Sequence, residues 1–175
     1  KAICIGENIR NPDFSLNILG QKISSAWKIQ LYSTYASTEM QTAFTECKSG
    51  IGGHQQPDLI YVELLDENGK QVPEGEAGEV TITTFGVEGM PLLRYRTGDM
   101  CISHSDVCAC GRHSMRLSPV LGRKQQMIKL KGTTMYPPAL FELLNGIEEI
   151  KDYVAEVYSN EIGTDEVVLH IQPQH

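Results

Sequence analysis

Four short groups of polar, aromatic and glycine residues stand out in this 175-residue chain. In chain order they are Gly6-Glu7, Tyr35-Ala36-Ser37-Thr38-Glu39, Tyr95-Arg96-Thr97-Gly98-Asp99 and Gly122-Arg123. Between them they offer an aromatic face, a hydroxyl beside a carboxylate, a carboxylate next to a glycine, and a guanidinium. Such side chains can stack on a purine, serve a phosphate and its Mg²⁺, and accept hydrogen bonds from ribose hydroxyls.

Each group also has a plain structural interpretation. Gly6-Glu7 follows the opening strand, where ligands bind in α/β sheets, but a simple turn has the same sequence. Thr38 and Glu39 could instead be the N-cap and first turn of a helix. Asp99, expected at a tight glycine turn after a strand over 91–93, suits two ribose hydroxyls, although Gly-Asp turns are common. Arg123 could contact ribose or phosphate, or be an ordinary surface arginine.

Cysteine and histidine residues form a second candidate site. Cys108 and Cys110 flank one alanine before Gly111, and Cys47 and His54 bracket a glycine-rich segment. Three thiols and an imidazole suit a tetrahedral structural Zn²⁺, which would pin the 45–57 loop to the 101–113 loop without an open position for catalysis.

The alternative is that these residues are unrelated reduced thiols and a surface histidine. If one ligand of the set is wrong, the substitutes are Cys101, His104 and His113.

Apolar patterns predict the elements that carry these residues. A strand over 2–6, a helix over 13–27 capped by Asp13, and a strand over 29–32 form a βαβ unit with a parallel sheet. Period-two strands over 59–64 and 78–83 make the middle portion antiparallel. A strand over 127–130, a turn at Gly132, a helix from Pro137-Pro138 and apolar stretches over 153–158 and 166–171 follow. The fold class is therefore mixed α/β.

Composition limits the partners. Fifteen Lys and Arg against 22 Asp and Glu give a net charge of −7, which argues against nucleic acid or an anionic membrane as a partner. The 41% hydrophobic content is that of a folded globular chain, and no apolar run is long enough to span a membrane. Five cysteines without a secretory leader argue against a disulfide framework, so we expect a cytoplasmic protein. Both ends fall at strand-like stretches, which suggests a piece of a longer protein.

The four ordered groups, followed by Lys131-Gly132, resemble the acyl-adenylate-forming superfamily, most closely its phenylacetate–CoA ligase branch. The resemblance covers essentially the whole chain. It implies that 1–123 is the later part of the adenylate-binding large domain, ending a βαβ-type core with an antiparallel β subdomain. It also implies that 124–175 begins the small, mobile α+β C-terminal domain.

The resemblance implies that a small carboxylic acid, by analogy an aromatic one, reacts with ATP to give an acyl-AMP, which coenzyme A converts to a thioester. Gly6 and Glu7 would lie against adenine, Tyr35 would stack on it beside the small Ala36 and Ser37, and Asp99 and Arg123 would grip the ribose. Thr38 would bind the α-phosphate and Glu39 would hold Mg²⁺. Lys131 and Gly132 would face the pantetheine tunnel, so the catalytic set is Thr38, Glu39 and Lys131. Some members of the branch look similar in carrying Cys and His at the zinc positions.

Several departures from the family pattern qualify these expectations. The upstream phosphate loop and the C-terminal lysine of the family are absent, so this chain alone should bind nucleotide poorly and catalyse little. Gln125-Gln126 replace an acidic pair at the hinge, and Ala36 replaces a common glycine. Two alternatives stay open: a non-catalytic, zinc-stabilised nucleotide-binding relative, and an adenylating enzyme with a carrier-protein acceptor. A homodimer is also compatible with the sequence.

Overall fold

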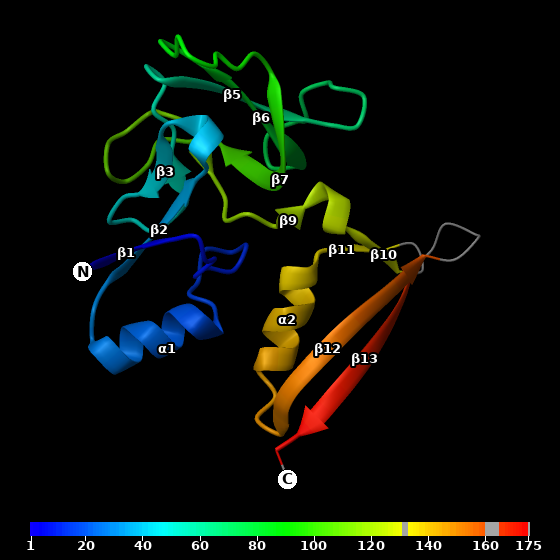
Figure 1. Cartoon of the computed structure of the whole chain (residues 1–175). Helices are drawn as coiled ribbons and strands as arrows, with labels where there is room; N and C mark the ends of the chain where they lie inside the picture. The colour runs from blue at the N-terminus through cyan, green and yellow to red at the C-terminus, as the bar shows by residue number, and fades with distance from the viewer. Residues whose placement is uncertain (131–132, 160–164, 175) are drawn as a thin grey trace. The chain divides into compact units, whose positions relative to one another are not determined.

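The computed structural model describes residues 1–130, 133–159 and 165–174. The chain forms two compact units, Lys1–Leu121 and Gly122–His175 (Figure 1). Strands dominate both units, and the mixed α/β class expected from the sequence is confirmed.

The first unit opens with the expected βαβ arrangement. Strand β1 (Ala2–Ile5) pairs in parallel with β2 (Leu31–Ala36), and helix α1 (Ile18–Trp27) connects them. The helix begins later than predicted because Asn17, whose side chain accepts a 2.9 Å hydrogen bond from the Gly20 N–H, is its N-cap. The prediction of Asp13 as N-cap was wrong. Asp13 instead accepts bonds from the backbone and hydroxyl of Ser15 in a local turn.

The rest of the first unit is antiparallel, as predicted. Its strands are β3 (Ala43–Glu46), β4 (Gly53–His54), β5 (Ile60–Leu65), β6 (Ala77–Thr84), β7 (Tyr95–His104) and β8 (Arg116–Leu117). The order across the sheet is β1-β2-β3-β4-β8-β7-β6-β5. A strand predicted over 91–93 is absent: this segment is a loop that bonds to Thr84, whose N–H donates to the Leu92 carbonyl oxygen.

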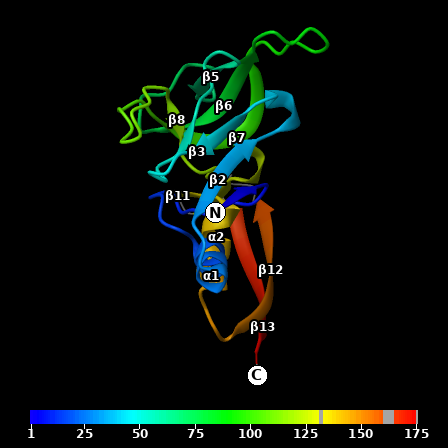
Figure 2. The ribbon, with the colours of Figure 1, turned by 90° about the vertical axis from the view of Figure 1, so that its left-hand side faces the viewer.

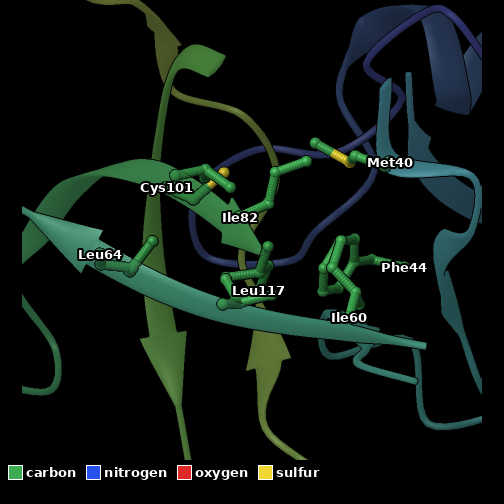
Figure 3. Close-up of a cluster of buried hydrophobic side chains, with 9 residues drawn as sticks. Met40, Phe44, Ile60, Leu64, Ile82, Cys101 and Leu117 are labelled. Carbon is green, nitrogen blue, oxygen red and sulfur yellow. The ribbon is translucent and has the colours of Figure 1, made fainter. Parts of the chain in front are cut away.

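The core of this unit shows that its sheet curls over on itself. Phe44 of β3 and Ile60 of β5 belong to one buried cluster, although four strands separate β3 from β5 in the sheet order. Figure 3 shows these side chains together with those of the neighbouring strands. The buried members are Met40, Phe44, Ile60, Val62, Leu64, Val80, Ile82, Cys101 and Leu117. Tyr35 packs against this cluster from its edge, so the core fixes one residue of the candidate site.

The second unit consists of short strands, a helix and a long hairpin. Its elements are β9 (Gly122–Arg123), the 3-10 helix η2 (Lys124–Gln126), β10 (Ile128–Leu130), β11 (Thr133–Met135), α2 (Pro137–Asn145), β12 (Ile150–Ser159) and β13 (Asp165–Pro173). The strand before Lys131 and the helix starting at Pro137 were predicted. Helix α2 lies beside the β12–β13 hairpin, with the rings of Phe141 and Tyr153 5.9 Å apart (Figures 1 and 2).

The predicted turn at Gly132 lies outside the described residues. Within the described part of the chain, no helix is long and apolar enough to cross a membrane.

Candidate functional site

Parallel pairing brings the first two residue groups to one edge of the sheet. Ile5 of β1 lies opposite Thr34 of β2, so Gly6 and Tyr35 each follow one member of the last residue pair in this parallel register. Gly6 adopts φ +87°, which turns the chain away from the strand, and Gly6 and Glu7 are exposed. Ligands of α/β sheets bind beyond the carboxyl ends of parallel strands, which is where these residues lie.

A hydrogen bond brings the third group to the same edge. The Oη of Tyr35 donates to Oδ2 of Asp99 at 2.8 Å, and the Tyr35 ring is stacked on Phe44 with centroids 5.9 Å apart. Burial, with the nearby Cys101 and Asp99, raises the pKa of Tyr35 well above its ordinary value. Tyr35 is therefore a neutral, fixed donor to a carboxylate.

Asp99 owes its position to a bulge in β7, and the expectation of a tight turn was wrong. The register of β6 against β7 shifts between Glu79 and Thr81, and Gly98 adopts φ +80° at this irregularity. The hydroxyl of Thr97 donates to the Val80 carbonyl and accepts the Asp99 N–H at 3.1 Å. A bulge redirects side chains within a strand, which here places Asp99 at Tyr35.

The loop after β2 carries the hydroxyl and carboxylate that the sequence singled out. Thr38 is exposed and Glu39 half-buried in the 3-10 helix η1 (Thr38–Met40). Thr38 is not an N-cap, because Ser37 is the N-cap residue of η1. The Ser37 side chain makes no capping hydrogen bond. Ala36 ends β2 opposite Ala43 of β3.

Three predicted site residues belong to the second unit. Arg123 is exposed in β9. Lys131 and Gly132 lie outside the described residues. The predicted roles of these three residues therefore stay predictions.

The structure brings all four predicted zinc ligands together. The ligand atoms of Cys47, His54, Cys108 and Cys110 all lie within 4.8 Å of one another. The Sγ atoms of Cys47 and Cys108 are 3.6 Å apart, and Sγ of Cys110 is 3.5 Å from Nε2 of His54. Tetrahedral coordination with ordinary Zn–S and Zn–N bond lengths requires separations of about 3.7 Å for two sulfurs and about 3.5 Å for sulfur and nitrogen. The donor set thus suits a zinc ion, and these two separations match its tetrahedral geometry.

Neighbouring groups prepare these ligands for a cation. Nδ1 of His54 is 3.3 Å from the Ser114 hydroxyl, a contact that orients the imidazole and leaves Nε2 toward Cys110. The backbone N–H of Arg112 lowers the pKa of Cys110 to about 7. For Cys47, burial opposes ionisation, but hydrogen bonds from Ser49, His54 and Cys108 together outweigh it and lower the pKa. Both effects favour the thiolate, which is the form that binds metals.

The substitute ligands lie elsewhere. Cys101 is in the hydrophobic core (Figure 3), His104 packs edge-on against the Phe14 ring at 5.3 Å, and His113 is exposed. Sequence reasoning missed Ser114, Arg112 and Arg116 around the cluster. A lone serine or arginine carries no pattern, although the charged Arg116 does lie between the apolar Met115 and Leu117.

Comparison with known proteins identifies the class to which this fold and site correspond. No protein-family model matches the chain. A crystal structure of 2-hydroxyisobutyryl-CoA ligase, in the postadenylation state with R3-HIB-AMP, superposes with a TM-score of 0.78 and 25% identity. It covers 98% of this chain and 37% of that protein. The chain therefore has the fold of part of an adenylate-forming CoA ligase.

Curated relatives define the branch more closely. The phenylacetate–CoA ligase of Thermus thermophilus is 35% identical over 122 residues, which is 69% of this chain and 27% of that protein. The corresponding enzyme of Pseudomonas putida is 27% identical over 117 residues. The chain is a fragment-length homologue of phenylacetate–CoA ligases, and it spans about a quarter of their length.

Proposed function

We propose that this chain is the part of an ATP-dependent acyl-CoA ligase that holds the adenosine of the acyl-adenylate. The observation that supports the proposal is the hydrogen bond between Tyr35 and Asp99 at the sheet edge where β1 ends, just before Gly6. These residues come from three separate motifs of the resemblance, in a chain homologous to acid–thiol ligases.

The reaction has two displacements. A carboxylate oxygen of the acid attacks the α-phosphorus of ATP, a new P–O bond forms, and the bond to the β-phosphate oxygen breaks to release pyrophosphate. The thiol of CoA then attacks the acyl carbon, a C–S bond forms, the C–O bond to AMP breaks, and the thiol proton is lost to a base. Both steps depend on positioning and on neutralising charge at phosphorus.

The residues of the first unit have distinct roles in this proposal. Tyr35 offers its ring to adenine, with Gly6 and Glu7 beside it, and Asp99 accepts hydrogen bonds from the ribose hydroxyls. Thr38 donates to an α-phosphate oxygen. Glu39 would hold Mg²⁺, which supplies positive charge at the phosphates when bound. We add Arg123, Lys131 and Gly132 to these nucleotide- and CoA-binding residues only because of the family resemblance.

The proposal also covers which carboxylic acid is activated and which thiol accepts the acyl group. An aromatic acid is proposed because the curated relatives are phenylacetate–CoA ligases. Transfer to a carrier-protein thiol would use the same residues and is the second candidate. The test is pyrophosphate release from ATP by the full-length protein with a panel of aryl and short-chain acids, with and without CoA. Acid-dependent release with CoA-dependent thioester formation is expected. No release from folded protein with any acid would favour a non-catalytic relative.

We also propose that Cys47, His54, Cys108 and Cys110 hold a structural zinc ion. Bound zinc would crosslink the loop after β3 to the loop after β7, and four protein ligands leave no position for a reactant. Metal analysis of protein purified without chelator should find about one zinc per chain. Cys108→Ser should lose it, whereas Cys4→Ser, which alters a half-buried thiol on β1 outside the cluster, should keep it.

A further inference from the structure

Arg116 is a buried cation that links the two ligand-bearing segments. It is the largest fully buried side chain in the first unit, with 2% of its surface exposed. Its Nη1 donates to the Ile51 carbonyl oxygen at 2.6 Å. Its Nη2 donates to the carbonyl of Asp106 at 3.2 Å and to Oδ1 of Asp106 at 2.6 Å.

The two residues that accept these hydrogen bonds lie in the two chain segments that carry the proposed zinc ligands. Ile51 stands between Cys47 and His54, and Asp106 stands two residues before Cys108. One planar guanidinium therefore fixes the backbone of both segments at once. The strand pairing adds a third connection, because His54 of β4 lies directly opposite Arg116 of β8.

The position of Arg116 is energetically demanding. A buried guanidinium is tolerated only when it is paired and hydrogen-bonded, yet the Asp106 side chain is 69% exposed. Its buried Nε has no hydrogen-bond partner among the described residues. The hydrogen bonds to Ile51 and Asp106 therefore hold the guanidinium in this position.

We propose that Arg116 is a positioning residue of the metal site, an inference that rests on the proposed zinc ligands. It holds the 47–54 and 106–110 segments at coordinating separation before the metal arrives. The ligands are then already assembled, so zinc binding does not have to order two loops. Altering an outer group of this kind typically weakens metal binding by about 10- to 100-fold.

The test compares metal affinities of variants that keep all four ligands. Arg116→Met removes the hydrogen bonds to Ile51 and Asp106 while keeping a long side chain. Arg116→Lys keeps the positive charge, but a single ammonium group cannot replace the two Nη atoms that bond to the two residues. Arg94→Met is the matched control, since Arg94 forms an exposed ion pair with Glu63 away from the cluster. Zinc affinity is measured by competition with a chromophoric chelator. Co²⁺ absorption reports the thiolate ligand set at saturating metal.

The expected result is a loss of zinc affinity of about 10- to 100-fold in Arg116→Met and a smaller loss in Arg116→Lys. At saturation both variants should show the wild-type Co²⁺ spectrum, which loss of a ligand would change. Arg94→Met should bind as wild type does. Wild-type zinc affinity in Arg116→Met overturns the inference. If circular dichroism shows that this variant does not fold, the zinc affinity of Arg116→Lys is compared with that of the wild type instead, and an unchanged affinity overturns the inference. Absence of zinc binding by the wild-type chain overturns the metal site itself, and the inference with it.

Discussion

The phenol of Tyr35 and the carboxylate of Asp99 form a 2.8 Å hydrogen bond across 64 positions of sequence. The bond joins the end of a parallel strand to a bulge in an antiparallel one, and it ties the proposed adenine platform to the proposed ribose acceptor. A shift of either group therefore moves the other, so the two proposed contacts to one nucleoside would be held in a fixed relation.

Tyr35→Phe tests this relation because it keeps the ring and removes the hydroxyl. The loss of a hydrogen bond to a charged acceptor should lower the free energy of unfolding by about 1.5–3 kcal/mol. In the full-length protein, the KM for ATP should rise by roughly 3- to 10-fold, and the preference for ATP over 2′-deoxy-ATP should shrink. Tyr32→Phe on the same strand is the control. An unchanged preference between the two nucleotides would show that Asp99 does not depend on Tyr35.

The pH dependence of stability should report the thiol of Cys110 in metal-free protein. The backbone N–H of Arg112 lowers the folded-state pKa from 9.0 to about 7, so the folded state favours the thiolate. This contribution is complete above the unfolded-state pKa and is lost as the pH falls through about 7. Stability should therefore rise between about pH 7 and 9.

Urea unfolding with chelator and reductant across that range measures the effect. Cys110→Ser should flatten the rise to the part contributed by Cys47, whose pKa is also lowered. Cys4→Ser should keep the wild-type slope. Burial raises the pKa of Cys101, so its opposing contribution begins only above its ordinary value of 9.0 and stays outside the range. Equal slopes in Cys110→Ser and wild type would contradict the assignment.

Gly53 should tolerate no side chain. A Cβ at this position would overlap the backbone carbonyl of Phe44 on the neighbouring strand, and the next residue is the proposed zinc ligand His54. Gly53→Ala should lower the free energy of unfolding by about 1–3 kcal/mol and weaken zinc binding. Gly89→Ala, where an added Cβ meets nothing within 4 Å, should stay within about 0.5 kcal/mol of wild type. Thermal unfolding of both variants decides the comparison.

Two ion pairs should contribute very different amounts to the free energy of unfolding. Arg10 and Glu46 are 2.6 Å apart with side-chain exposures of 12% and 2%, and Glu46 also accepts the Ser33 N–H. Arg10→Met leaves a buried carboxylate without its cation and should cost about 3–5 kcal/mol. Arg94→Met breaks the exposed pair with Glu63 and should cost about 0–1 kcal/mol. Chemical denaturation measures both, and similar losses would show that burial does not set the difference.

Local chemistry made a large part of this structure predictable from sequence. Alternating apolar residues predicted the antiparallel strands around Val62 and Val80, and the apolar segments before Gly6 and Tyr35 predicted the parallel pair. Proline at the first turn predicted helix α2. The four cysteine and histidine residues that the structure brings together were also singled out from the sequence, because three thiols and an imidazole suit a structural zinc ion.

Other features depended on hydrogen bonds and strand pairing that the apolar pattern of the sequence does not specify. The helix predicted from Asp13 begins at Ile18, because Asp13 bonds to Ser15 and Asn17 makes the capping bond. The predicted turn at Asp99 is a bulge, because pairing of β6 with β7 continues past Gly98.

The amino-acid sequence by itself determined which chemical groups this protein has, since residue type and spacing fix the ligands, the aromatic ring and the carboxylates. Only the tertiary structure decided which of them meet. The contact of Tyr35 with Asp99 and the placement of Arg116 between two loops arise when a curled sheet brings separate strands together. Such contacts leave no periodic signal along the chain, because packing and pairing between distant segments set them.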